Sequence, residues 1–254
     1  MIKTIFKVIG ILLILGYLLA AGLMYGGWRE EPVYKGLQVN VDYPNDDAHF
    51  VNPADIRSKI LPSKLNPIGK PFSQVNTMEI SQLVEQNKLV RNAAVYHTPD
   101  SLLRIDITQR NPIIRVKSSL GVKDSKGTAV SDFYIDLDGE LMPAQFGSAI
   151  RLPLVTGYVR DRHIMPLHDF ALYLKENDFW SDEVTQIYVR ENGDFELVPR
   201  IGSHTILVGN FENIDEKLDH VRTFYKKVMP RKGWNAYRVI NAKFEGQIVG
   251  EKNN

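Results

Sequence analysis

The sequence predicts an α+β protein with a single N-terminal transmembrane helix followed by two domains outside the membrane. Three observations lead to this fold class. Residues 8–28 carry no charge, short strand-like segments recur after Pro32, and amphipathic helices separate groups of those strands. The predicted organisation is a cytoplasmic tail at 1–7, a transmembrane helix at 8–28, domains at 36–112 and 113–250, and a tail at 251–254.

The composition of the chain excludes several functional classes. Its 254 residues include 31 Lys+Arg and 30 Asp+Glu, which gives a formal net charge of +1. A nucleic-acid-binding protein would show clustered excess of basic residues, so we expect no nucleic acid partner. The chain contains no cysteine. Thiol catalysis, cysteine-ligated zinc and disulfides are therefore excluded.

The uncharged run from Val8 to Trp28 has the length of a membrane span. As a helix it would be about 30 Å long, which matches the hydrocarbon core of a bilayer. Lys3 and Lys7 precede it, so the positive-inside rule keeps the N-terminus in the cytoplasm and exports the rest. A cleaved signal peptide is the alternative, but residues 20–22 form a weak cleavage site, and we expect an uncleaved single-pass anchor.

The first exported domain has the element order β-α-α-β-β. Gly36–Tyr43 alternates apolar and polar residues, which predicts a half-buried strand. Asn52 and Pro53 predict the start of a short helix, and Asn76 with Glu79 has the spacing of a capping box at the start of a second one. Two further strands follow, Val90–His97 and Ser101–Gln109.

The second exported domain is rich in strands and has two helices. Asp138-Gly139 predicts a hairpin turn within Phe133–Met142, because both positions must tolerate positive φ. We expect a loop or hairpin at Ser118–Ser131. Other strands are predicted at Ile113–Val116, Leu152–Val155, Val184–Arg190, Phe195–Pro199, Thr205–Val208, Tyr237–Phe244 and Gln247–Val249. Helices are predicted at Pro166–Glu176 and from a capping box at Asn213 and Glu216 to Met229, where Pro230 ends the helix.

Motifs that carry chemistry are missing from the sequence. No nucleophile elbow, P-loop or metal-binding histidine pattern occurs. His163 and His168 have a poor spacing for two ligands on one helix, and the acidic run at Asp136–Glu140 lacks the distal ligands of a calcium loop. We therefore expect no catalytic residues, no metal and no cofactor. An open sheet edge near the C-terminus, where another chain could add a strand, favours a binding protein.

The order of these segments resembles the bacterial FtsQ/DivIB cell-division family. Residues 89–95 and 102–112, the latter reading LLRIDITQRNP, are similar to the end of that family's POTRA domain. Residues 133–139 and 152–157 resemble the beginning of its β-domain, and residues 239–249 resemble its terminal strands. The sequence departs from the family at Asn241, where an acidic residue is common, and at Phe244, where tyrosine is common.

The resemblance implies a non-enzymatic divisome scaffold in the cell inner membrane, concentrated at the septum. Its implied partners are FtsB- and FtsL-like single-pass proteins, with a link to septal peptidoglycan synthases. The family's contact is implied at the terminal strand edge, which maps to Tyr237, Arg238, Val239, Ile240, Asn241, Ala242, Lys243, Phe244, Gly246, Gln247 and Ile248. The alternatives are a membrane-anchored envelope hydrolase or transferase, and a POTRA-bearing export or assembly factor.

Overall fold

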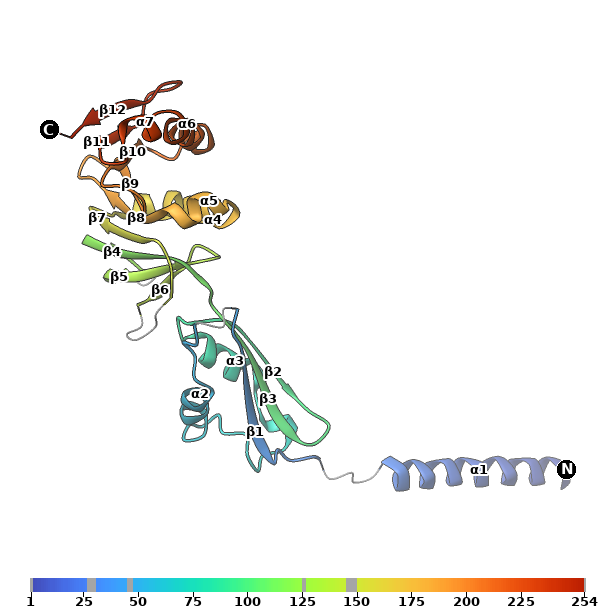
Figure 1. Cartoon of the computed structure of the whole chain (residues 1–254). Coiled ribbons are helices and arrows are strands. Elements are labelled where there is room, and N and C mark those ends of the chain that lie inside the picture. Colours follow the sequence, from blue (N-terminus) through green and yellow to red (C-terminus); the bar gives the residue numbers. More distant parts are fainter. Residues whose placement is uncertain (1, 27–30, 45–47, 125–126, 145–149, 254) are drawn as a thin grey trace.

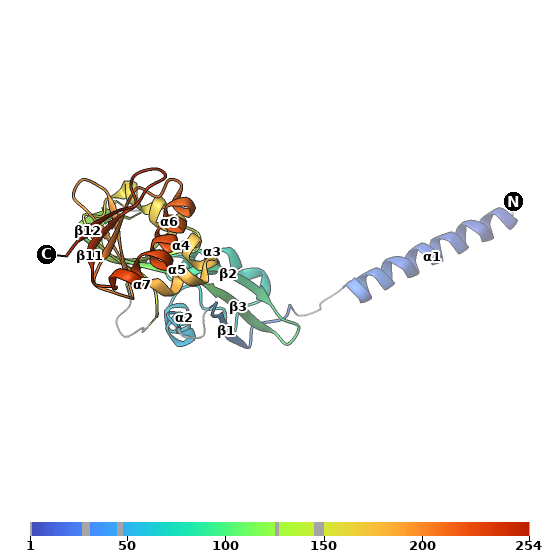
Figure 2. The same cartoon turned by 45° about the horizontal axis from the view of Figure 1, so that its top comes forward.

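The computed structural model contains an N-terminal helix and two α+β domains (Figure 1). It describes residues 2–26, 31–44, 48–124, 127–144 and 150–253, with the backbone alone at 2–6, 8 and 23–26. Helix α1 spans Ile2–Gly26 and extends away from the two domains in both views (Figures 1 and 2). The end of the predicted transmembrane segment, including Trp28, lies outside the described residues. Among the described residues, no helix combines the length and hydropathy that a membrane span requires.

The first domain has the predicted β-α-α-β-β order. It comprises β1 (Gly36–Asp42), α2 (Pro53–Ile60), a 3-10 turn η1 (Phe72–Gln74), α3 (Thr77–Glu85), β2 (Val90–His97) and β3 (Leu102–Gln109). The sheet order is β1-β3-β2, with β1 parallel and β2 antiparallel to β3. Side chains on one face of this sheet pack against α2 and α3 around Ile60, Ile80 and Ile105, which are fully buried.

Both predicted helix caps of the first domain are present. The Asn52 side chain accepts a hydrogen bond from the Ala54 amide at 2.9 Å, and Pro53 occupies the first helical position. The Asn76 side chain accepts from the amides of Met78 and Glu79. Each cap satisfies backbone donors that the first helical turn leaves without a partner. The helix starts are therefore encoded by single side chains.

The second domain is built on a nine-stranded mixed sheet. The first strands are β4 (Pro112–Lys123), β5 (Ala129–Asp136), β6 (Leu141–Pro143) and β7 (Leu154–Gly157). They are followed by β8 (Val184–Val189), β9 (Phe195–Pro199), β10 (Thr205–Gly209), β11 (Tyr237–Asn241) and β12 (Val249–Lys252). The spatial order is β12-β11-β10-β9-β8-β7-β4-β5-β6.

Helices cover one face of this sheet. They are α4 (Ile164–Glu176) after the 3-10 turn η2 (Asp161–His163), α5 (Asp178–Glu183), α6 (Ile214–Lys227) and α7 (Met229–Lys232). Figure 2 shows α4, α5 and α6 stacked on that face. The core between the two layers includes Phe170, Ile187 and Leu218, each with at most 1% of its surface exposed.

Several predicted boundaries in the second domain are wrong. The strand predicted at Ile113–Val116 is longer and runs from Pro112 to Lys123 as β4. The loop or hairpin expected at 118–131 is a hairpin, because β4 and β5 pair again at Val122 and Val130 beyond a bulge. Helix α6 ends at Lys227, and Pro230 is the second residue of α7 instead of the end of the helical region, since proline fits the first turn of a helix. Helix α5 is absent from the predicted elements. Of the turn residues at 138–139, only Gly139 has a positive φ.

The start of α6 also differs from the prediction. Asn213 adopts a left-handed conformation with φ of 51°, and its side chain makes no capping hydrogen bond. The capping-box spacing to Glu216 is therefore present without the capping geometry. The helix is positioned by burial of Leu218, Val221 and Tyr225 against the sheet.

Candidate partner-binding edge

The large sheet has two edge strands, β6 at one end and β12, the last strand of the chain, at the other. Strand β11 pairs in parallel with β10 and antiparallel with β12, so both of its edges are occupied. The expectation that Tyr237–Phe244 forms the open edge strand is therefore wrong. Because the chain reverses after Phe244 and returns as β12, the last strand shields β11. Among the described strands, none pairs with the outer side of β12.

The backbone of β12 presents alternate residues to the outside. The Asn253 amide donates to the Ala236 carbonyl at 3.1 Å, so Asn253 faces β11. In an antiparallel ladder, the N–H and C=O groups of alternate residues point to the same side. Val249 and Glu251 therefore face β11, while Gly250 and Lys252 direct their N–H and C=O groups outward. These two residues therefore present backbone groups that no described strand pairs with.

Three of the predicted contact residues are buried. Val239, Ile240 and Ala242 have 7%, 0% and 1% of their surface exposed. The Ala242 amide donates to the Leu207 carbonyl at 2.9 Å, which ties the end of β11 to β10. These residues form the support of the edge strand, and their side chains do not face a partner.

The remaining predicted residues lie at or near the surface. Arg238 is exposed and donates to the Glu251 carboxylate at 3.0 Å, which joins β11 to β12 on the face opposite the helices. The Tyr237 ring packs edge-on against Phe224 at 5.2 Å and covers Gly250. Phe244 is 49% exposed, and Val249 is 43% exposed at the start of β12. Asn241 and Ile248 are partly buried, whereas Gly246 and Gln247 are exposed in the turn.

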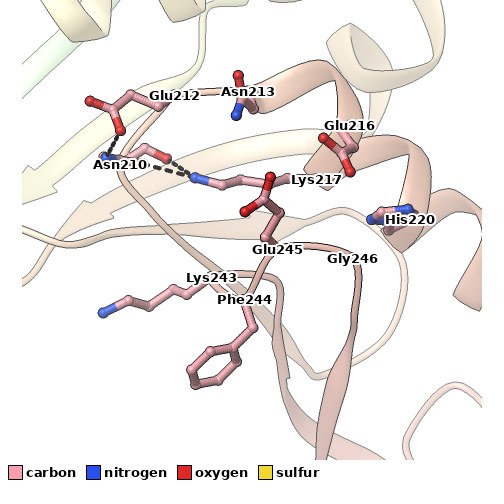
Figure 3. Close-up of a pocket in the computed structure, with 10 residues that line it drawn as sticks. All are labelled: Asn210, Glu212, Asn213, Glu216, Lys217, His220, Lys243, Phe244, Glu245 and Gly246. Atoms are coloured by element: carbon pink, nitrogen blue, oxygen red, sulfur yellow. Dashed lines mark hydrogen bonds between the residues drawn. The ribbon is translucent and has the colours of Figure 1, made fainter.

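The turn between β11 and β12 borders a small cavity of about 250 Å³. Figure 3 shows its lining, which comes from the loop before α6, from α6 and from this turn. Lys217 reaches across the loop and donates to Val208 O, Asn210 O and Asn210 Oδ1 at 2.8–3.1 Å. Burial lowers the pKa of the Lys217 ammonium. This lysine holds the loop in place beneath the turn.

An ion pair fixes the start of the turn to a neighbouring hairpin. Lys243 Nζ lies 2.6 Å from the Asp194 carboxylate in the β8–β9 hairpin. Although burial favours the protonated form of Asp194, the hydrogen bonds from Lys243 and Asn192 hold the pKa of its carboxyl below its usual range. The turn is thus tied to the body of the domain, and β12 is presented at a defined position.

Part of this edge is not predictable from local sequence patterns. Glu251 and Lys252 belong to β12, although a polar tail is predicted from residue 251. Edge strands facing water carry charged residues, so their sequences lack the apolar alternation that identifies strands. The roles of Asp194 and Lys217 are not predictable from local sequence either, because their contacts join different elements of the chain.

The histidines do not form a metal centre in the described part of the chain. No group of three potential histidine, aspartate or glutamate ligands occurs there. His163 packs edge-on against Phe195 at 5.6 Å, whereas His168 contacts Asp169 and the Leu137 carbonyl. The two rings therefore belong to different environments.

Comparison with known families identifies both domains. Residues 111–251, more than half of the chain, match the family model described as FtsQ/DivIB, C-terminal related. Residues 33–108 match the model of a POTRA-like domain. No curated protein matches the chain. The first match includes the whole sheet from β4 to most of β12, and the second covers the sheet of the first domain.

Proposed function

Because the chain belongs to the FtsQ/DivIB family, we propose that it is a cell-division scaffold that binds a partner strand along β12. The family consists of non-enzymatic division proteins associated with the inner membrane at the septum. The observation that carries the proposal is the outward direction of the Gly250 and Lys252 backbone groups at the sheet edge. An extended segment adds to such an edge through main-chain hydrogen bonds.

The proposed partners are FtsB- and FtsL-like single-pass proteins. Main-chain pairing with β12 sets the register, while Phe244 and Val249 offer exposed apolar surface beside the edge. Lys243 is held by Asp194, so it contributes through the position of the turn. In this scheme the scaffold links the partner pair to septal peptidoglycan synthesis, and the POTRA domain recruits other membrane proteins.

Substitution at Lys252 tests the strand-addition proposal. Lys252→Pro removes the outward N–H donor of β12, while Lys252→Ala keeps it and removes only the side chain. In the full-length chain, the proline variant is expected to weaken binding of a purified FtsB–FtsL-like pair by about tenfold or more. The alanine variant is expected to bind within about twofold of the parent, because the backbone is unchanged.

Circular dichroism and the unfolding midpoint serve as controls for folding of both variants. A Lys252→Pro chain that is folded and binds the partners as tightly as Lys252→Ala would contradict strand addition at β12. Ala242→Pro is a poor test, because the Ala242 amide donates to Leu207 inside the sheet and its loss would disturb the fold.

Residues 8–28 are the proposed membrane anchor. Leu12, Leu13 and Leu18 are each more than half exposed in α1. Apolar surface of this kind is unfavourable in water and favourable in a hydrocarbon layer. After alkaline carbonate extraction, the chain should remain in the membrane pellet, and its C-terminal domain should be accessible only from outside the cytoplasm. Release of the intact chain by carbonate would refute the anchor.

A further inference from the structure

At one end of the large sheet lie basic side chains that form no ion pair with described residues. Strands β7, β8, β10 and β11 begin at this end, and β9 finishes there at Pro199. Arg151 lies just before β7 and Arg200 just after β9, and both are exposed. Neither forms an ion pair with any residue that the structure describes, in contrast to Arg115, Arg190 and Arg238 elsewhere on the sheet.

Arg151 and Arg200 line the same groove, which has a volume of about 390 Å³. Its other walls come from Leu152, Pro153, Ser181, Val184 and Thr185. The groove therefore combines two cations with apolar surface. The adjoining helix α5 carries the exposed Asp178 and Asp182 and the buried Glu183. None of these carboxylates is among the described residues that line the groove.

The surface continues from Arg200 toward α7. The loop at 200–203 contacts the segment at 234–235, where Ser203 Oγ donates to Asn235 Oδ1 at 3.2 Å. Ile201 and Trp234 are 43% and 37% exposed on these two loops. Arg231 and Lys232 precede Trp234 and are also exposed. Exposed cationic and apolar side chains thus lie near one another beyond the groove.

We propose that this groove, with Arg151 and Arg200 as its charged contacts, docks an extended protein segment that carries acidic and apolar side chains. Guanidinium groups form bidentate hydrogen bonds with carboxylates. A purely charged polymer would not use the apolar walls, whereas a peptide with alternating side chains fits both features. The groove is separate from the β12 edge, because Arg200 follows β9 and the strands β10 and β11 lie between β9 and β12 (Figure 1).

Other basic residues of this region have a sufficient local explanation. Lys226 and Lys227 lie in the last turn of α6, where positive charge offsets the helix dipole. Arg231 and Lys232 occupy the same position in α7. The proposal therefore rests on Arg151 and Arg200, which lie in loops and line the groove.

Because the proposal gives the chemistry of the bound segment and not its sequence, selection from a library of random peptides displayed on phage tests it. The full-length chain in detergent is the target, and its matched variants are Arg151→Glu/Arg200→Glu and the control Lys117→Glu/Lys123→Glu. Lys117 and Lys123 are exposed in β4 and form no ion pair with described residues, so the control makes the same charge change elsewhere.

Selected peptides are expected to combine Asp or Glu with apolar residues. Their affinity should fall at least tenfold in the groove variant and stay within about twofold in the control. Binding of the FtsB–FtsL-like pair should be unchanged in the groove variant, so failure here is distinguishable from failure at β12. The proposal is overturned if acidic residues are not enriched, if both variants bind equally, or if polyglutamate of the same length competes as well as the selected peptides.

Discussion

Gly157 allows β7 and β8 to approach each other closely. It pairs with Val189 and has a φ of 94°, and a Cβ atom at this position would lie 2.3 Å from the Val189 carbonyl oxygen. A Cβ on Gly246, which also has a positive φ, would meet no atom within 4 Å. Substitution of Gly246 therefore measures the free-energy cost of a left-handed backbone alone, whereas substitution of Gly157 adds the cost of a steric clash.

Gly157→Ala is expected to lower the free energy of unfolding by about 3 kcal/mol, because it adds both strain and overlap. Gly246→Ala should cost only about 1 kcal/mol, because only the backbone strain applies. Urea unfolding of the two variants measures the difference. Equal losses in both variants would show that the backbones of β7 and β8 are free to move apart.

His204 is a second residue with a measurable effect. Its ring is buried, its Nε2 atom lies 2.7 Å from the Tyr225 hydroxyl, and burial lowers the pKa of its imidazole below 6.5. The folded state therefore binds a proton less readily than the unfolded state. The stability contributed by the neutral ring is present above pH 6.5 and is lost as the pH falls through the lowered pKa.

The difference in unfolding free energy between the parent chain and His204→Gln isolates this effect. The difference should be largest at neutral pH and should shrink as the pH falls below 6.5. Urea unfolding of both chains across this range measures it. A difference that is constant with pH would mean that the ring has the same proton affinity in both states.

At the scale of single elements, the helix starts of the two domains differ in how they are specified. The Asn52 side chain caps α2, whereas Asn213 precedes α6 in a left-handed conformation without a capping bond. Asn52→Ala should therefore destabilise the chain by about 1 kcal/mol. Asn213→Gly should be neutral or stabilising by up to about 1 kcal/mol, because glycine adopts this conformation without strain.

Chemical denaturation of these two variants measures both effects. A destabilised Asn213→Gly variant would indicate that the asparagine side chain supports α6 through a contact of its own. An Asn52→Ala variant as stable as the parent chain would show that the Asn52 cap does not stabilise α2.

Local signals explain which elements are predictable from sequence. The caps at Asn52 and Asn76, the strands at Val184–Arg190 and Phe195–Pro199 and the helix at Pro166–Glu176 depend on neighbouring residues, and the structure places them within two residues of their predicted bounds. The extension of β4 and the position of β12 depend on pairing with distant strands. The sequence also predicts an open sheet edge near the C-terminus but assigns it to residues 237–244, whereas the edge strand is β12.

At the scale of the whole molecule, the two domains share a junction with a buried ion pair. Arg110 Nη1 donates to the Asp136 carboxylate at 2.8 Å, and Asp136 is 1% exposed. Nearby, Arg91 pairs with Asp138 at 2.7 Å on the surface, and the rings of Phe50 and Tyr134 lie 6.1 Å apart. Polar and apolar contacts therefore hold the POTRA-like domain against β5.

The two arginines of the junction should contribute unequally. Arg110→Ala leaves a buried carboxylate without its cation and is expected to cost about 3 kcal/mol. Arg91→Ala removes an exposed pair and should cost less than about 1 kcal/mol. Urea unfolding measures these losses, and limited proteolysis at the junction should be faster only for Arg110→Ala. Equal effects of both substitutions would contradict the importance of the buried pair.

Amide hydrogen exchange of β12 tests the central claim most directly. In the free chain, the Gly250 and Lys252 amides should exchange faster than those of Val249 and Glu251, because they point away from β11. On binding of the FtsB–FtsL-like pair, the account predicts that Gly250 and Lys252 become protected while Val249 and Glu251 change little. Binding that leaves the exchange of Gly250 and Lys252 unchanged would contradict strand addition at this edge.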